Sequence, residues 1–248
     1  KEGGNYWKDR TEVWHLGPYS FVEADVKQWG EWGIDYLKYD WNPLDYYHVK
    51  EMHDALRTLD RDVVYSLSNS APYGDAPQWM RYSNCWRTTG DTWESISSIG
   101  FSQDRWLPFN RPGHWADPDM LVIGMVGWGP KLHYTQLTAD EQYTHISLWS
   151  LLAAPLLIGC DMAQMDDFTR SLLTNDEVID VNQDPLGLQA VPVWQQGDQV
   201  IYAKHLEDGS MAVGLFNRGW QTVKMNFTLR MLGLRGRQTV RDLWRQKD

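Results

Sequence analysis

"GIDYLKYDWNP" (residues 33–43) is the stretch that decides the fold. It follows an amphipathic segment that ends on a glycine, which indicates a short strand after a helix. Successive side chains of a strand point to opposite faces, so Lys38 and Asp40 share one face. Asp40 lies at the carboxyl end, where parallel α/β folds bind their ligands. Asp40 could therefore serve as a nucleophile or as an electrostatic stabiliser. From the spacing alone, a buried Lys–Asp ion pair that only positions a loop explains the two charges equally well.

Strand and helix signals alternate through about the first 160 residues, which predicts a parallel sheet with helices outside it. The strongest helix signal covers 137–154, where Thr138 and Glu141 have capping-box spacing. Further helices are expected over 21–33, 44–59, 78–83 and 92–106. The predicted strands lie at 34–40, 62–69, 84–89, 115–121 and 155–159.

The pattern changes after "VIDVNQDPLG" (178–187), where short alternating segments separated by turn residues replace the helices. This change predicts an antiparallel β domain from about residue 188. Its strands are expected at 190–194, 199–206, 211–217, 223–229 and 239–244.

Composition excludes several classes of function. The formal net charge of −10 argues against nucleic acid, whose binding needs a basic surface. The sequence contains no run of 18 or more apolar residues, so no membrane span is expected. The only two cysteines, Cys85 and Cys160, form neither a disulfide framework nor a metal-ligand spacing, so no metal is expected. The fifteen Trp and twelve Tyr are expected mostly in the hydrophobic core, although aromatic faces also stack on sugar rings.

A second carboxylate ends another predicted strand, in "CWRTTGD" (85–91). If the strand extends to Asp91, the side chains of Asp91 and Arg87 point to the same face. A predicted helix follows Asp91, so a helix N-cap is its alternative role. Two carboxylates on neighbouring strand ends are the usual apparatus of glycoside hydrolysis. Two more, Asp117 and Asp119 in "HWADPDML", favour a turn or strand-end hydrogen-bonding role.

Five motifs occur in an order that resembles glycoside hydrolase family 27, the α-galactosidases and α-N-acetylgalactosaminidases. They are "WGIDYLKYD" (32–40), "WRTTGD" (86–91), "PGHWADPDMLVIG" (112–124), "SLWSLLAAPLLIGCD" (147–161) and "EVIDVNQDPLG" (177–187). The resemblance implies an α/β fold in which residues 1–187 form part of a (β/α)8 TIM barrel, about strands 4 to 8. Residues 188–248 then form a C-terminal antiparallel β domain. A missing N-terminal segment or another chain is expected to complete the barrel.

The resemblance also implies roles for individual residues. Members are retaining exo-glycosidases that act on oligosaccharides or polysaccharides without a cofactor. Asp40 corresponds to the nucleophile and Asp91 to the general acid/base of the family. Lys38 and Arg87 match residues that hydrogen-bond sugar hydroxyls.

Trp115 and Asp119 match the wall of the pocket, with a mainly structural role. Asn69 stands where galactosidases of the family have a Glu that recognises the 2-OH. Asn can donate as well as accept, so α-N-acetylgalactosamine or β-L-arabinopyranose is an alternative sugar. A non-catalytic carbohydrate-binding fragment is the alternative of another class. Asn42 replaces a family cysteine, which is compatible with a bacterial-type relative and, in turn, with a secreted or periplasmic enzyme.

Overall fold

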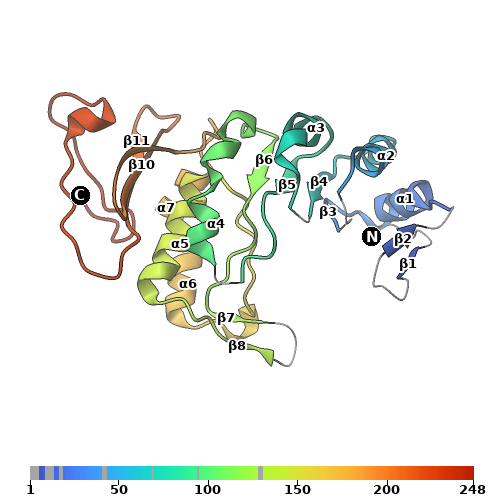
Figure 1. The fold of residues 1–248 in the computed structure, drawn as a ribbon, viewed down its shortest axis with the longest axis horizontal. Coiled ribbons are helices and arrows are strands. Elements are labelled where there is room, and N and C mark those ends of the chain that lie inside the picture. Colours follow the sequence, from blue (N-terminus) through green and yellow to red (C-terminus); the bar gives the residue numbers. More distant parts are fainter. Residues whose placement is uncertain are drawn as a thin grey trace. The chain divides into compact units, whose positions relative to one another are not determined.

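The computed structural model describes residues 6–8, 14–16, 19–40, 44–68, 70–93, 95–127 and 131–248 (Figure 1). The chain divides into two compact units, Lys1–Gly90 and Asp91–Asp248, and each is described by itself. The predicted domain boundary between 187 and 188 lies inside the second unit and stays a prediction. No helix in the described part of the chain is long and apolar enough to cross a membrane.

The first unit opens with two strands that were not predicted and then alternates helices and strands as predicted. Its elements are β1 (Tyr6–Lys8), β2 (Trp14–Leu16), α1 (Val22–Trp32), β3 (Tyr36–Tyr39), α2 (Tyr46–Leu56), β4 (Val64–Leu67), η1 (Tyr73–Asp75), α3 (Ala76–Tyr82) and β5 (Cys85–Arg87). Strands β3, β4 and β5 pair in parallel, whereas β1 and β2 form an antiparallel pair. The alternation therefore builds the expected βαβ units.

Local signals set the ends of the helices that flank β3. Helix α1 ends at Gly33, whose φ of 74° is a left-handed conformation that favours glycine. Helix α2 begins at Asp45, whose side chain accepts a hydrogen bond from the backbone N–H of His48. Its inward face carries Val49 and Met52, both fully buried. The two caps leave only a short segment for β3 and its following loop.

The parallel register sorts side chains between the two faces of the sheet. Lys38 pairs with Ser66, and Ser66 pairs with Cys85, so these three side chains lie on one face. The other face carries the aromatic and aliphatic residues that follow them, Tyr39, Leu67 and Trp86, all fully buried or nearly so. Hydrophobic packing on that face holds the sheet to its helices.

The second unit combines helices with small sheets. Its elements are α4 (Ile96–Gly100), η2 (Gln103–Phe109), β6 (Trp115–Asp117), β7 (Met125–Val126), β8 (His133–Tyr134), α5 (Ala139–Leu151), η4 (Met162–Gln164), α6 (Asp167–Leu173), α7 (Asp176–Asn182), β9 (Val191–Gln196), β10 (Gln199–His205), β11 (Met211–Asn217) and η5 (Leu229–Leu232). Helix α5 carries the predicted capping box of Thr138 and Glu141. It packs against α4, α7 and β11 around one hydrophobic core.

Before the C-terminal β region, the structure differs from a predicted helix and from a predicted strand. The helix predicted over 92–106 begins only at Ile96 and separates into α4 and η2. The strand predicted at 155–159 is wrong, because the described residues there form only a single parallel bridge between Leu121 and Ile158. Pro155 has no N–H to donate, and Leu157 and Ile158 remain more than a third exposed.

The C-terminal β region is a three-stranded antiparallel sheet in the order β11-β10-β9. The strands predicted at 223–229 and 239–244 are wrong. The first segment is irregular and leads into the 3-10 helix η5, and the second forms one bridge between Asp242 and Lys247. Alternation predicts which face a strand would bury, but a strand forms only where another strand accepts its hydrogen bonds.

Candidate functional site

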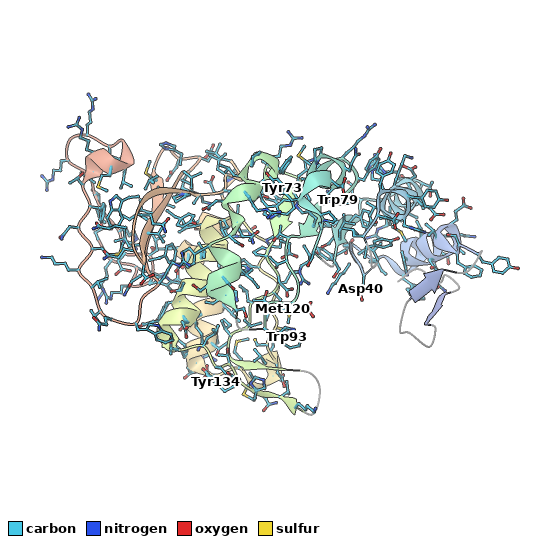
Figure 2. The ribbon with its side chains drawn as sticks, viewed as in Figure 1. Asp40, Tyr73, Trp79, Trp93, Met120 and Tyr134 are labelled. Carbon is cyan, nitrogen blue, oxygen red and sulfur yellow. The ribbon has the colours of Figure 1, made fainter. Side chains whose placement is uncertain are left out.

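Strand β3 presents the two charges of the opening stretch at its carboxyl end. Lys38 and Asp40 are both exposed, and Tyr39 between them is buried, as strand alternation predicts. Figure 2 shows Asp40 just after β3. Its carboxylate is thus accessible to a ligand at the end of the sheet where ligands bind in parallel folds.

Tyr39 fixes the backbone that carries Asp40. Its carbonyl accepts a hydrogen bond from Ser68 N at 3.1 Å, and its hydroxyl donates to His48 O at 3.4 Å. The Tyr39 ring also meets the Tyr65 ring edge-on, with centroids 5.6 Å apart. The end of β3 is therefore held to both β4 and α2.

Arg87 ends β5 and lies on the same face as Lys38, because both share parity with Ser66 in the register. Its side chain is only 4% exposed, and Nη2 donates to Thr89 O at 3.3 Å. Its own carbonyl accepts from Ala71 N at 2.7 Å. A guanidinium carries five N–H donors in a fixed fork, which suits a residue beside a site for a hydroxylated ligand.

The predicted sugar-recognition residue Asn69 lies outside the described residues, as do Trp41, Asn42 and Pro43. Its neighbour Ser70 has a φ of 48°, in the left-handed region that few non-glycine residues adopt. Such strained positions cluster at ligand sites.

Asp91 opens the second unit and is exposed, while the next residue, Thr92, is completely buried. The alternative role of Asp91 as a helix cap is wrong, because α4 begins at Ile96 and its N-cap is Ser95, four residues after Asp91. The backbone N–H of Thr92 donates instead to Asp119 Oδ2 at 2.8 Å. Its hydroxyl donates to Pro118 O at 3.1 Å. The backbone next to Asp91 is thus held in place through Thr92.

Asp119 is 6% exposed and has a φ of 88°. Its N–H donates to Asp117 Oδ1 at 2.8 Å, which is the strand-end hydrogen-bonding role expected of Asp117. Its carbonyl accepts from the indole Nε1 of Trp149, also at 2.8 Å. The turn after β6 is therefore held from both sides.

The half-buried ring of Trp115 on β6 packs against the turn that ends the "DPLG" motif. A Cβ added at Gly187 would lie 2.6 Å from Trp115 Cη2, so only glycine allows this approach. The neighbouring Ala116 N donates to Asn110 Oδ1 at 2.6 Å, which fixes the strand.

His145 on α5 contacts the segment that follows the turn after β6. It is fully buried, and burial lowers its pKa to about 3, so the ring is neutral at neutral pH. Its Nε2 accepts from Val122 N at 3.1 Å, and its ring meets Trp149 edge-on with centroids 4.2 Å apart. A neutral imidazole thus links α5 to the turn that carries Asp119.

The structure gathers Lys38, Asp40 and Arg87 on one sheet face of the first unit. In the second unit it links Asp91 to Asp119 through Thr92. The distance between the two predicted catalytic carboxylates stays a prediction.

Sequence reasoning overlooked Ser66, Ser68 and Thr92. Ser66 pairs with Lys38 in the register, Ser68 follows two residues later, and both serines are buried. Their alternation in "YSLS" was the available signal.

Comparison with known proteins gives two family matches. The family described as "Alpha galactosidase A" matches residues 7–184, and "Alpha galactosidase C-terminal beta sandwich domain" matches 196–248. Among curated relatives, Alpha-galactosidase 2 of Arabidopsis thaliana is 39% identical over 92% of this chain and 58% of its own length. An alpha-N-acetylgalactosaminidase of Gallus gallus is 33% identical over 79% of this chain and 51% of its own.

Solved structures agree with these matches. A GH27 β-L-arabinopyranosidase from Geobacillus stearothermophilus, in complex with arabinose, has a TM-score of 0.86 and 28% identity. The match covers 96% of this chain and 59% of that one. The predicted fold class, part of a TIM barrel followed by an antiparallel β domain, is thereby confirmed. This chain spans between half and three fifths of the length of these relatives. The chain belongs to the α-galactosidase family, glycoside hydrolase family 27.

Proposed function

We propose that the protein carrying this chain is a retaining exo-α-glycosidase that removes terminal α-galactosyl residues. The observation that carries this proposal is Asp40, an exposed carboxylate at the end of a parallel strand, beside Lys38 on the same sheet face. Relatives named α-galactosidase, 37–39% identical over 92% of the chain, support galactose as the sugar.

In the proposed reaction, Asp91 donates a proton to the glycosidic oxygen while the Asp40 carboxylate attacks the anomeric carbon. The aglycone leaves and a covalent glycosyl-enzyme forms. Water then attacks the anomeric carbon, Asp91 accepts its proton, and the sugar leaves with its configuration retained. This scheme requires the two carboxyl groups to lie about 5–5.5 Å apart.

Donors on the first unit orient the sugar in this proposal. Lys38 offers three N–H donors and Arg87 five, which suits the hydroxyls of a pyranose ring. Trp115 contributes an aromatic wall, and recognition of the substituent at C2 is the role assigned to Asn69. The proposed substrate is an oligosaccharide or polysaccharide, and the proposed reaction uses no cofactor.

We further propose that strands outside this chain complete the barrel. A barrel of eight strands takes about 250 residues. The part that matches the α-galactosidase model is residues 7–184, and the relatives are longer. Among the described residues, β3 pairs on one edge only, with β4. A sheet edge of this kind accepts another strand.

A second sugar is favoured by one specific observation. Asn69 carries no charge where galactosidases of the family place a Glu, and relatives include an alpha-N-acetylgalactosaminidase and a β-L-arabinopyranosidase. The same machinery would then act on α-N-acetylgalactosamine or β-L-arabinopyranose.

The test uses the full-length protein and nitrophenyl glycosides of the three sugars. We expect α-galactoside to be hydrolysed with the largest kcat/KM, and NMR of the first product to show the retained α-anomer. Asp40→Asn should lower kcat by more than about 10³-fold, because no other group forms the covalent bond. Asp60→Asn, an exposed loop carboxylate, is the matched control and should keep full activity.

Three results would contradict the proposal. Inversion at the anomeric carbon would exclude Asp40 as a nucleophile, and normal turnover by Asp40→Asn would do the same. Absence of hydrolysis of all three sugars by a folded full-length protein that still binds them would favour a non-catalytic carbohydrate-binding role.

A further inference from the structure

We propose that Asp119 is a positioning residue for Asp91 and does not contact the sugar. Its carboxylate holds the backbone of Thr92 and so sets the direction in which the Asp91 side chain leaves the chain. This inference deepens the proposed function and rests on it, because it assigns the group that orients the general acid/base.

The first argument is the contact itself. Asp119 Oδ2 accepts the Thr92 N–H at 2.8 Å, and both residues are buried, at 6% and 0% exposure. A hydrogen bond from a backbone N–H to a buried carboxylate is charge-assisted and about twice as strong as a neutral one. The Thr92 hydroxyl donates to Pro118 O at 3.1 Å. Two adjacent bonds therefore clamp Thr92, the residue next to Asp91, onto one turn.

The second argument is the strain at Asp119. A φ of 88° costs a non-glycine residue about 1–3 kcal/mol and persists only where surrounding contacts hold it. Here Asp117 accepts the Asp119 N–H, and Trp149 donates to its carbonyl. Glycine would adopt this backbone without strain, so stability alone does not explain an aspartate at this position. The carboxylate and its bond to Thr92 do.

The third argument is the position of the clamp relative to the first helix of the unit. Helix α4 starts only at Ile96, and Trp93 has a φ of 34°. Ser95 and not Asp91 is the N-cap of α4, and the two bonds to Thr92 fix the backbone next to Asp91. A misplacement of about 1 Å in a reacting group costs on the order of 10²-fold in rate.

The test compares Asp119→Asn, Asp119→Gly and Asp119→Ala in the full-length protein, with the exposed Asp180→Ala on α7 as control. Asn keeps an oxygen acceptor and tolerates left-handed backbone, so it should retain kcat to within about tenfold. Gly relieves the strain but removes the acceptor, so it should lose about 10²-fold in kcat with KM little changed. Thermal unfolding separates this loss from destabilisation.

Leaving-group dependence identifies the group through which Asp119 acts. Proton donation matters for a disaccharide and hardly for a dinitrophenyl glycoside, whose leaving group needs no proton. Asp119→Gly should therefore lose much more kcat/KM, which reports the step that forms the glycosyl-enzyme, on the disaccharide. Adding Asp119→Gly to Asp91→Asn should cause no further loss, since both changes remove the same function. Equal losses on both substrates, additive losses, or a rise in KM alone would each overturn the positioning role.

A structural measurement stands apart from turnover. In Asp119→Gly, the backbone amide resonance of Thr92 should shift and its hydrogen exchange should quicken, while residues of α7 stay unchanged. An unchanged Thr92 amide would overturn the inference whatever the activity. If the wild-type protein hydrolyses no glycoside but the Thr92 amide responds as expected, the proposed function fails and the clamp on Asp91 stands.

Discussion

At the scale of single residues, the surroundings decide what a side chain does. Asp91 and Asp119 are the same residue type in two family motifs, yet one is exposed and the other is buried against Thr92. The buried carboxylate orients backbone, whereas the exposed one is accessible for proton transfer. Burial also lowers the pKa of two further groups, His145 and Lys204.

His145 makes the stability of the fold sensitive to acid. Burial lowers its pKa to about 3, against about 6.5 in the unfolded chain, so between these values the unfolded state binds the extra proton. The free energy of unfolding should fall by about 2 kcal/mol from pH 7 to pH 5 through this residue. Urea unfolding of His145→Gln should show a pH dependence reduced by that amount. An unchanged dependence would mean that the imidazole is not kept neutral by burial.

Lys204 makes the stability of the fold depend on pH in the alkaline range. Burial lowers its pKa to about 8, and its Nζ donates to Ser150 O at 3.4 Å. Between pH 8 and about 10.5 the folded state has lost a proton that the unfolded state keeps, so stability should rise with pH. From pH 8 to 10 the expected gain is on the order of 2 kcal/mol. Lys204→Met should lack this gain in urea unfolding, and the exposed Lys224→Met should keep it.

At the scale of elements, close packing joins α4 to α5. Gly100 ends α4, and a Cβ added there would lie 2.5 Å from Leu148 Cδ2 and 2.7 Å from the Trp149 ring. Both neighbours are fully buried, so neither side chain has room to move. The glycine is therefore required by the approach of the two helices.

Gly100→Ala should destabilise the protein despite the higher helix propensity of alanine. Overpacking costs about 1–3 kcal/mol, which exceeds the 0.5–1 kcal/mol or so that alanine gains within a helix. Gly74→Ala in η1 is the control, because no atom lies within 4 Å of a Cβ added there. Thermal unfolding should show a lower Tm for the first variant alone. Equal Tm values would show that α4 can shift away from α5.

At the scale of the whole molecule, a polar network ties the segment before β6 to Gln189, which lies just before β9. Asn110 Nδ2 donates to Gln189 Oε1 at 2.8 Å, and Gln189 Nε2 donates to Gln103 O at 3.0 Å. Gln103 and Gln189 are both buried. Buried amides of this kind need all their partners, because an unpaired one costs more than the bond contributes.

Asn110→Ala and Gln189→Ala should each lower the free energy of unfolding by about 1–3 kcal/mol, because each leaves a buried partner unsatisfied. The double variant should lose clearly less than the sum, since the two residues share one bond. A double-mutant cycle in urea measures this coupling. Strictly additive losses would show that the two side chains act independently.

Elements with strong local signals were predictable from the sequence. Helix α5 has its capping box, α1 has its glycine stop, and β3, β4 and β5 lie between such signals. The shared sheet face of Lys38 and Arg87 needed more, because it depends on the parallel register through Ser66. Alternation within one strand determines which of its side chains share a face. Only the pairing of strands determines which side chains of different strands share a face.

The sequence by itself determined the family, the order of strands and helices in the first unit, and the alternation that exposes Lys38 and Asp40. These properties depend on neighbours along the chain, which composition and spacing record. Tertiary structure alone decided that 223–229 and 239–244 are not strands and that Asp119 turns its carboxylate to Thr92. Those outcomes depend on contacts between residues distant in sequence, since a strand needs a partner edge and a buried charge needs a donor.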